Sequence, residues 1–236
     1  MGFLQRLFGE KKNALLDAPV DYSLFFSSNQ YDGIELKHLE LGDLFLPTGK
    51  IVACDPLVFL RDWEPFNKNV NPGKYPVTVC VAKTENSGDR YAVVQVKFSY
   101  GEPVKWKMAL SDDRKAEELK NPGDYVGFPV DAGLGCFCDF ETQKLYKQFE
   151  EKFYISNPEG NIYDDYFAAE FKNNAEDKED PNDIGDWLNY NIPDSEDMNV
   201  IMFHSGYGDG YYPCYWGLDK SDNICRLIVD FMVFDL

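Results

Sequence analysis

Apolar and polar residues alternate over several stretches of the chain, which is the pattern of β-strands that bury one face. Residues 75–99 contain two such runs, joined by turn-forming residues at 86–89. Residues 43–55 contain two apolar runs around a Pro-Thr-Gly turn, and residues 104–110 alternate apolar residues with lysine. Because consecutive strands tend to pair, we predict an antiparallel meander in which 104–110 is a third neighbour.

The last third of the chain also predicts strands. Three apolar runs occupy residues 199–205, 211–217 and 223–235, separated by Gly-Asp-Gly and by Asp-Lys-Ser-Asp-Asn. Glycine, aspartate and asparagine tolerate the positive φ angles that tight hairpins need. Both linkers therefore predict hairpins, with Tyr211 and Tyr215 on one face of their strand.

Between these two groups of strands the apolar spacing changes to that of a helix. Residues 140–153 place apolar side chains at nearly helical intervals, and Asp139 before them suits the positive end of a helix dipole. Residues 164–174 predict a second, shorter helix. We therefore predict an α+β fold, with a mainly antiparallel, meander-like or sandwich-like sheet and two helices inserted between the N-terminal and C-terminal strand groups.

The pattern also suggests how the chain is organised. Residues 34–236 are expected to form a single domain with an acidic loop inserted near residues 173–198, and residues 1–33 an N-terminal helix and linker. An apolar stripe at residues 3–8 stands beside basic residues, and it predicts either a terminal helix docked on the domain or a weak membrane contact. No apolar run is long enough to predict a membrane-spanning helix.

Composition supports a globular protein of the cytoplasm. The chain has 236 residues, of which 44% are hydrophobic, and this is enough to build a sizeable core. Its six cysteines include no Cys-x-x-Cys pair, and most of them stand in apolar, strand-like runs. We therefore expect buried, reduced thiols and neither a zinc site nor another metal or cofactor.

The charge is strongly negative, at −18, and it is concentrated between Glu159 and Asp197, where 13 acidic residues face two lysines. Such a field repels nucleic-acid phosphates and favours a basic protein partner. Exposed aromatic rings would add anchors to an acidic interface. The residues that we consider as candidates for partner binding are Glu176, Asp177, Glu179, Asp180, Tyr207 and Trp216.

One constellation would suit catalysis or ligand binding. His204 ends a predicted strand, and Asp131 and Asp209 stand in turns, so the three define a candidate pocket. Ser205 is a poor nucleophile for this histidine, because adjacent residues on a strand point to opposite faces and no Gly-x-Ser-x-Gly elbow surrounds it. We therefore predict no catalytic residue, and a hydrolase-like or ligand-binding enzyme remains the alternative.

Several segments, in order, resemble the bacterial family catalogued as domain of unknown function 4241, over roughly residues 46–231. The segments that carry this resemblance are "LPTGKIVACDPL", "PGKYPVTV", "VKWKMAL", "VDAGLGCFCD", "SGYGDGYYPCYWGLD" and "LIVDF". The resemblance implies a bacterial cytosolic domain and no established activity. Families of this sort often stand among toxin-immunity and phage-defence genes, which favours a binding role by analogy. Our leading hypothesis is thus a non-enzymatic acidic protein that holds a basic protein partner, in the manner of an immunity protein or antitoxin.

Overall fold

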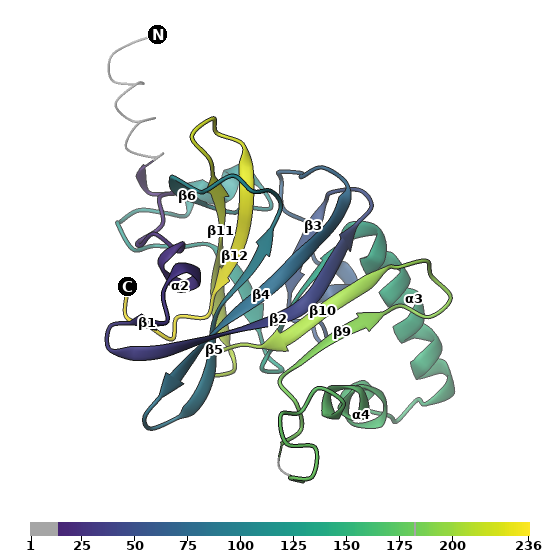
Figure 1. The fold of residues 1–236 in the computed structure, drawn as a ribbon. Coiled ribbons are helices and arrows are strands. Elements are labelled where there is room, and N and C mark those ends of the chain that lie inside the picture. The colour runs from purple at the N-terminus through teal and green to yellow at the C-terminus, as the bar shows by residue number, and fades with distance from the viewer. Residues whose placement is uncertain (1–13, 182) are drawn as a thin grey trace.

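The described strands form two antiparallel β-sheets (Figure 1). The computed structural model describes residues 14–181 and 183–236. Within these residues the large sheet contains β1 (Gln30–Tyr31), β2 (Ile34–Leu46), β4 (Gly73–Thr84), β5 (Gly88–Lys97), β6 (Lys105–Met108), β7 (Gly127–Val130), β11 (Gly210–Leu218) and β12 (Ile224–Asp230). The small sheet contains β3 (Ile51–Cys54), β8 (Leu134–Asp139), β9 (Trp187–Asn191) and β10 (Asn199–His204).

The strand order in the large sheet is β1-β2-β4-β5-β12-β11-β6, and β7 pairs with the first residues of β11. The order in the small sheet is β3-β8-β10-β9. All of these pairings are antiparallel. The predicted α+β class with mainly antiparallel sheets is therefore confirmed.

Two predicted pairings hold and two are wrong. The strands β4 and β5 are neighbours, as are β11 and β12. However, β6 pairs with β11 rather than with β5, and the Gly-Asp-Gly linker joins β10 of the small sheet to β11 of the large one. Turn residues fix a reversal of the chain but not the sheet that the next strand joins. Residues 200–203 of β10 are buried on both faces of the strand, because β10 lies in the small sheet with the large sheet on one side and the helices on the other.

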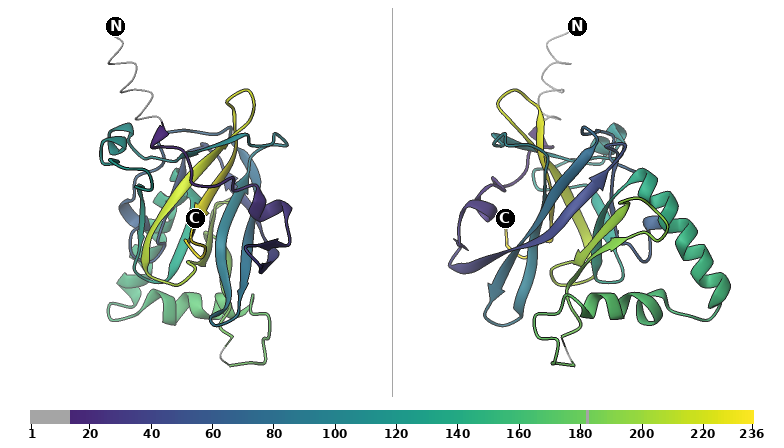
Figure 2. Two further views of the ribbon diagram at one scale, coloured as in Figure 1. Left: turned by 90° about the vertical axis from the view of Figure 1, so that its left-hand side faces the viewer. Right: turned by 45° about the vertical axis from the view of Figure 1, so that its right-hand side comes forward.

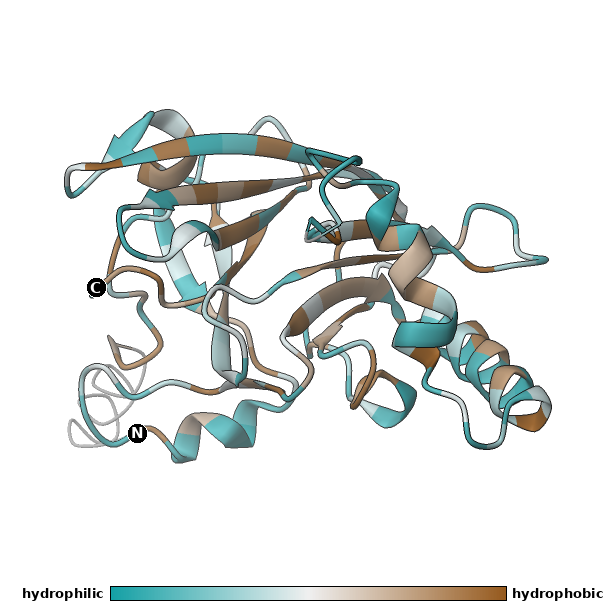
Figure 3. Cartoon of the chain, turned by 90° about the horizontal axis from the view of Figure 1, so that it is seen from below, coloured by the Kyte–Doolittle hydropathy of each residue, from teal (hydrophilic) through white to brown (hydrophobic). Residues whose placement is uncertain are grey.

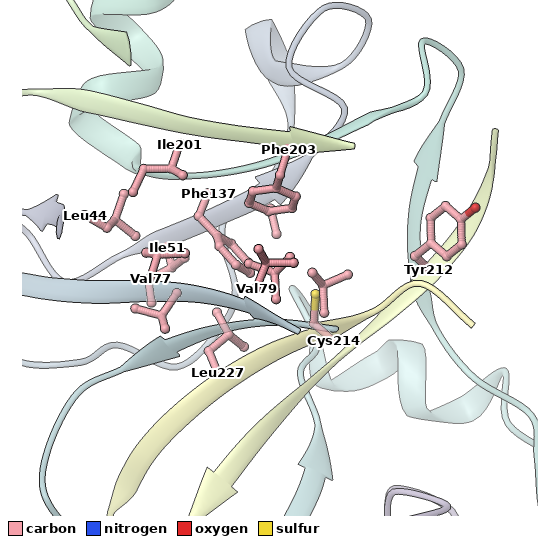
Figure 4. Close-up of a cluster of buried hydrophobic side chains, with 14 of the residues drawn as sticks. Leu44, Ile51, Val77, Val79, Phe137, Ile201, Phe203, Tyr212, Cys214 and Leu227 are labelled. Atoms are coloured by element: carbon pink, nitrogen blue, oxygen red, sulfur yellow. The ribbon is translucent and has the colours of Figure 1, made fainter. Parts of the chain in front are cut away.

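The space between the sheets is filled by one apolar core (Figure 4). Val77 and Val79 of β4 are fully buried in it, as are Phe137 of β8 and Ile201 of β10. In Figure 3 the central strands are largely brown and the connecting loops largely teal, so the apolar residues lie where the sheets pack. The two sheets therefore form a sandwich.

The outer face of the small sheet is covered by helices, as the right panel of Figure 2 shows. These are α3 (Phe140–Ser156), the π-helical η3 (Tyr163–Phe167) and α4 (Ala168–Lys172). Tyr146, Phe167 and Phe171 are fully buried against the sheet. Both predicted helices, at 140–153 and 164–174, are therefore confirmed.

Asp139 ties α3 to the turn between β2 and β3. Its carboxylate accepts hydrogen bonds from the Glu141 backbone N–H (2.9 Å) and from the backbone N–H (3.0 Å) and hydroxyl (2.8 Å) of Thr48. The first of these bonds caps the helix, as the acidic start of the predicted helix led us to expect. The same side chain thus fixes the point where the chain passes from the large sheet to the small one.

The outer face of the large sheet is covered by the chain before β2. Tyr22, which precedes the short helix α2 (Leu24–Ser27), and Phe25 within this helix are fully buried there. Two short 3-10 turns, η1 (Leu60–Asp62) and η2 (Asp113–Glu117), complete the described elements. The predicted apolar stripe at residues 3–8 lies outside the described residues.

The six cysteines all lie in the described part of the chain, and all are buried free thiols, as predicted. Burial raises the pKa of Cys80 to about 12, so this thiol stays protonated at neutral pH. Among the described helices, none is both long enough and apolar enough to cross a membrane.

Candidate functional site

The turns that contain Asp131 and Asp209 lie side by side. The Ser205 backbone N–H donates to the Gly133 carbonyl (3.1 Å), and the Gly133 N–H donates to Oδ1 of Asp209 (3.1 Å). Asp131 is exposed, and its backbone N–H donates to Asp55. Asp209 thus braces a turn, and the two turns together close one end of the sandwich.

His204 has a different partner from the ones we predicted. Its Nδ1 lies 3.0 Å from Oδ1 of Asp186, and its backbone N–H donates to the Asp186 carbonyl (2.9 Å). The register of β9 on β10, in which Trp187 lies opposite Phe203, places Asp186 at this point. Neither Asp131 nor Asp209 is among the described residues that line the cavity beside His204.

An acidic groove lies on the other side of Asp186. It has a volume of about 340 Å³ and is lined by residues of β2, β4 and β5 and by described residues of the segment 174–187. The walls are formed in part by Leu39 and by the aromatic rings of Tyr91 and Trp187. The charged residues that line the acidic groove are Asp89, Glu176, Asp183, Asp186 and Lys37.

The carboxylates that line the groove act together on the pKa of Tyr91. Burial raises the pKa of the Tyr91 phenol most, and the carboxylates of Asp186, Glu176, Asp183 and Asp89 raise it further. These are the four carboxylates that line the groove. All four carboxylates of the groove therefore act on the same group, the Tyr91 hydroxyl.

Lys37 is the cation among the described lining residues, and it is already paired. Its ammonium contacts Glu176, and this hydrogen bond raises the pKa of Lys37. Asp89 and Asp186 are both exposed to solvent. Four carboxylates against one ammonium give the described lining of the groove a net negative charge.

Hydrogen bonds connect several of the described residues in the loop of residues 173–186. The Lys172 ammonium donates to the Asp183 carbonyl (2.6 Å), and the Asp183 carboxylate accepts from the backbone N–H groups of Asp177 (2.8 Å) and Gly185 (3.1 Å). These backbone hydrogen bonds lower the pKa of Asp183, so it stays ionised. Gly185 has φ +79°, and a Cβ there would lie 2.0 Å from the Phe171 carbonyl oxygen, so glycine is required.

The predicted partner-binding residues fall into two groups. Glu176 lines the groove, and Asp177 and Glu179 are exposed on the same loop, where Asp180 is half-buried. Charge concentration alone was the signal that identified them.

The two aromatic candidates lie in different environments. Tyr207 is 58% exposed, and the Arg90 guanidinium lies 5.6 Å from its ring centre. Trp216 is fully buried in the core between the sheets, so its side chain reaches no partner. Alternation along β11 separates the two faces of the strand but does not indicate that both faces are covered.

A metal ion is held by several ligand side chains that meet at one point. Among residues 14–181 and 183–236, no three or more histidine, cysteine, aspartate or glutamate side chains are arranged to hold one.

Comparison with known proteins identifies one family. The family model described as "Protein of unknown function (DUF4241)" matches residues 44–229, which include all four groove carboxylates. No curated protein matches the chain, and no solved structure matches it. Because the family model covers more than half of the sequence, this chain belongs to the DUF4241 family.

Proposed function

We propose that this protein is a non-enzymatic binding protein that holds a basic protein partner in the cytoplasm, with an arginine or lysine side chain of that partner in the acidic groove. The observation that supports this most directly is the convergence of four carboxylates on Tyr91. A cation in the groove would meet negative charge together with the faces of two aromatic rings.

Arginine fits this groove better than lysine. A guanidinium is planar, forms paired hydrogen bonds with carboxylates and stacks on aromatic rings. Asp89 and Asp186 offer exposed carboxylates, and Tyr91 and Trp187 supply the rings. An arginine anchored in such a pocket is a typical hot spot of a protein interface.

The surface around the groove would add long-range attraction. The net charge of −18 is concentrated in the part of the chain that contains the loop, and Asp177 and Glu179 are exposed beside the groove. Charges at the rim of an interface raise the association rate and choose the partner more than they add affinity. We propose that the protein acts by occupying a basic surface, as an immunity protein or antitoxin does.

The proposal is tested with a short peptide that contains one arginine between glycines. We expect it to bind weakly, to bind more weakly at high salt, and to lose binding when citrulline, which is uncharged and similar in shape, replaces arginine. The binding constant is measured by titration with NMR detection. Equal binding of the arginine and citrulline peptides would contradict the proposal.

A matched pair of variants locates the binding site. Asp89→Asn with Glu176→Gln removes two groove charges, whereas Glu118→Gln with Asp164→Asn removes two exposed charges that do not line the groove. We expect the groove variant to weaken binding about tenfold, which corresponds to about 1.4 kcal/mol, and the control variant to have little effect. If both variants weakened binding equally, net charge rather than the groove would be responsible.

A further inference from the structure

The second cavity of interest is formed where β10 and β8 end. His204 lies opposite Leu134 in the small sheet, and both residues line a cavity of about 420 Å³. The C-terminal part of α3 adds Tyr154 to its wall, and the segment that leads into η3 adds Ile162 and Tyr163. The volume lies within the range of small-molecule sites.

The imidazole of His204 has a defined tautomer. Because a carboxylate only accepts hydrogen bonds, the contact with Asp186 (3.0 Å) places a proton on Nδ1. In the neutral ring, Nε2 is then a free acceptor. His38, the other histidine of the chain, has the opposite arrangement, because its Nε2 donates to the Phe25 carbonyl (2.8 Å).

The cavity is uncharged, unlike the acidic groove. Its walls are aliphatic at Leu57, Leu134 and Ile162 and aromatic at Tyr154 and Tyr163, and none of the described lining residues is an aspartate, glutamate, lysine or arginine. A charged ligand would therefore lose its hydration without gaining an opposite charge. The net charge of −18 adds a further penalty for an anion.

One wall of the cavity is fixed by a buried carboxylate. Asp55 is fully buried, and it accepts hydrogen bonds from the backbone N–H groups of Leu57 (2.8 Å) and Ala132 (2.7 Å), two residues that line the cavity. The wall is thus positioned before any ligand arrives, which reduces the entropy lost on binding.

We propose that this cavity binds a small, uncharged aromatic molecule that donates one hydrogen bond, from a hydroxyl or a ring N–H, to Nε2 of His204. The cavity and the acidic groove share no described lining residue, and Asp186 connects them because it lines the groove and contacts His204. The experiments below therefore alter only residues that do not line the groove.

The first experiment compares three probes. These are 2-naphthol, which has a hydroxyl donor, 2-methoxynaphthalene, which lacks one, and 2-naphthoate, which is an anion. We expect 2-naphthol to bind at least about fivefold more tightly than 2-methoxynaphthalene, because Nε2 stays unpaired with the ether, and 2-naphthoate not to bind. Equal affinities for the first two probes, or no binding of 2-naphthol at millimolar concentration, would overturn the proposal.

The second experiment follows the ring nitrogens of the two histidines by ¹H–¹⁵N NMR, at a pH at which both imidazoles are neutral. We expect the free protein to show an Nδ1–H tautomer for His204 and an Nε2–H tautomer for His38, and the His38→Gln variant assigns the signals. Addition of 2-naphthol should shift Nε2 of His204 and leave His38 unchanged. An Nε2–H tautomer for His204, or binding that leaves its Nε2 signal unmoved, would refute the inference.

The variant His204→Phe completes the test. The partly exposed ring is replaced by one of similar shape without the acceptor, so the cavity keeps its apolar walls. We expect 2-naphthol to bind at least about fivefold more weakly and 2-methoxynaphthalene to bind as before. Unchanged binding of 2-naphthol would exclude His204 from the site. If neither probe bound, the variant would have lost the cavity itself. The affinities of 2-naphthol and 2-methoxynaphthalene are then compared again in His204→Gln, which keeps a polar group at this position.

Discussion

Replacement of Asp55 tests how the wall of the His204 cavity is built. The carboxylate is fully buried and accepts four backbone hydrogen bonds, from Leu57 (2.8 Å) and Val58 (3.2 Å) at Oδ1 and from Asp131 (3.0 Å) and Ala132 (2.7 Å) at Oδ2. Asp55 therefore joins the segment after β3 to the turn between β7 and β8. In Asp55→Ala all four N–H groups lose their acceptor.

The expected cost follows from these four bonds. A hydrogen bond to a charged group contributes about 1.5–3 kcal/mol, but Val58, Asp131 and Ala132 are exposed residues, and water can replace part of what their amides lose. We therefore expect Asp55→Ala to lower the free energy of unfolding by about 3 kcal/mol. Asp55→Asn keeps one oxygen and so two of the bonds, but its NH2 group then faces the other two N–H donors and cannot accept from them, so we expect a cost of similar size.

Urea unfolding, followed by tryptophan fluorescence, measures both variants. Trp216 is fully buried between the sheets, so its emission reports the loss of the core. The exposed Asp164→Asn serves as a control and should leave the unfolding free energy unchanged. A loss of less than about 1 kcal/mol in either Asp55→Ala or Asp55→Asn would refute this account of the site.

Two further predictions concern stability. Gly49 and Gly33 both have positive φ (+72° and +79°), but a Cβ at Gly49 would lie 2.0 Å from the Val70 carbonyl oxygen, whereas Gly33 faces open space. We expect Gly33→Ala to cost about 1 kcal/mol and Gly49→Ala at least about 3 kcal/mol in urea unfolding, and equal costs would contradict the clash. Burial raises the pKa of the Asp230 carboxyl above 3.8, and the hydrogen bond from Tyr22 opposes this shift. The Asp230 carboxyl therefore binds its proton more tightly in the folded state than in the unfolded state. The stability gained from this protonation is fully present below pH 3.8 and is lost as the pH rises through the pKa of the folded state. We expect Asp230→Asn to reduce the fall of the melting temperature over this pH range, measured by thermal unfolding at a series of pH values. An unchanged slope of melting temperature against pH would refute this role of Asp230.

Several elements of this fold were predictable because they show a local periodicity, whereas β8 and β9 were not predicted as strands. Alternation identified β4 and β5, and helical spacing after Asp139 identified α3, since a strand and a helix bury different sets of positions. The lateral order of strands was not predictable in the same way. The pairing of β5 with β12 and of β6 with β11 joins segments that are far apart in the sequence, and no turn between them records it.

The candidate sites show the same limit. Glu176 was identified from the concentration of charge, but Asp89 reaches the groove from β5, and its own sequence neighbourhood is not unusual. His204 was identified as a polar residue at a strand end, whereas its partner Asp186 follows from the register of β9 on β10. Contacts between elements, rather than residues within one element, therefore determine what these sites can bind.

The pairing of β5 with β12 has a consequence for how the protein is made. During translation β2, β4 and β5 leave the ribosome early and can form a three-stranded unit, but the free edge of β5 has to wait for β12, which is the last strand in the described chain. An unpaired edge strand invites association with other nascent chains. Chaperone binding to this exposed edge should therefore decide the yield of the protein in the cell, and slower synthesis of the segment between β5 and β12 should lower that yield.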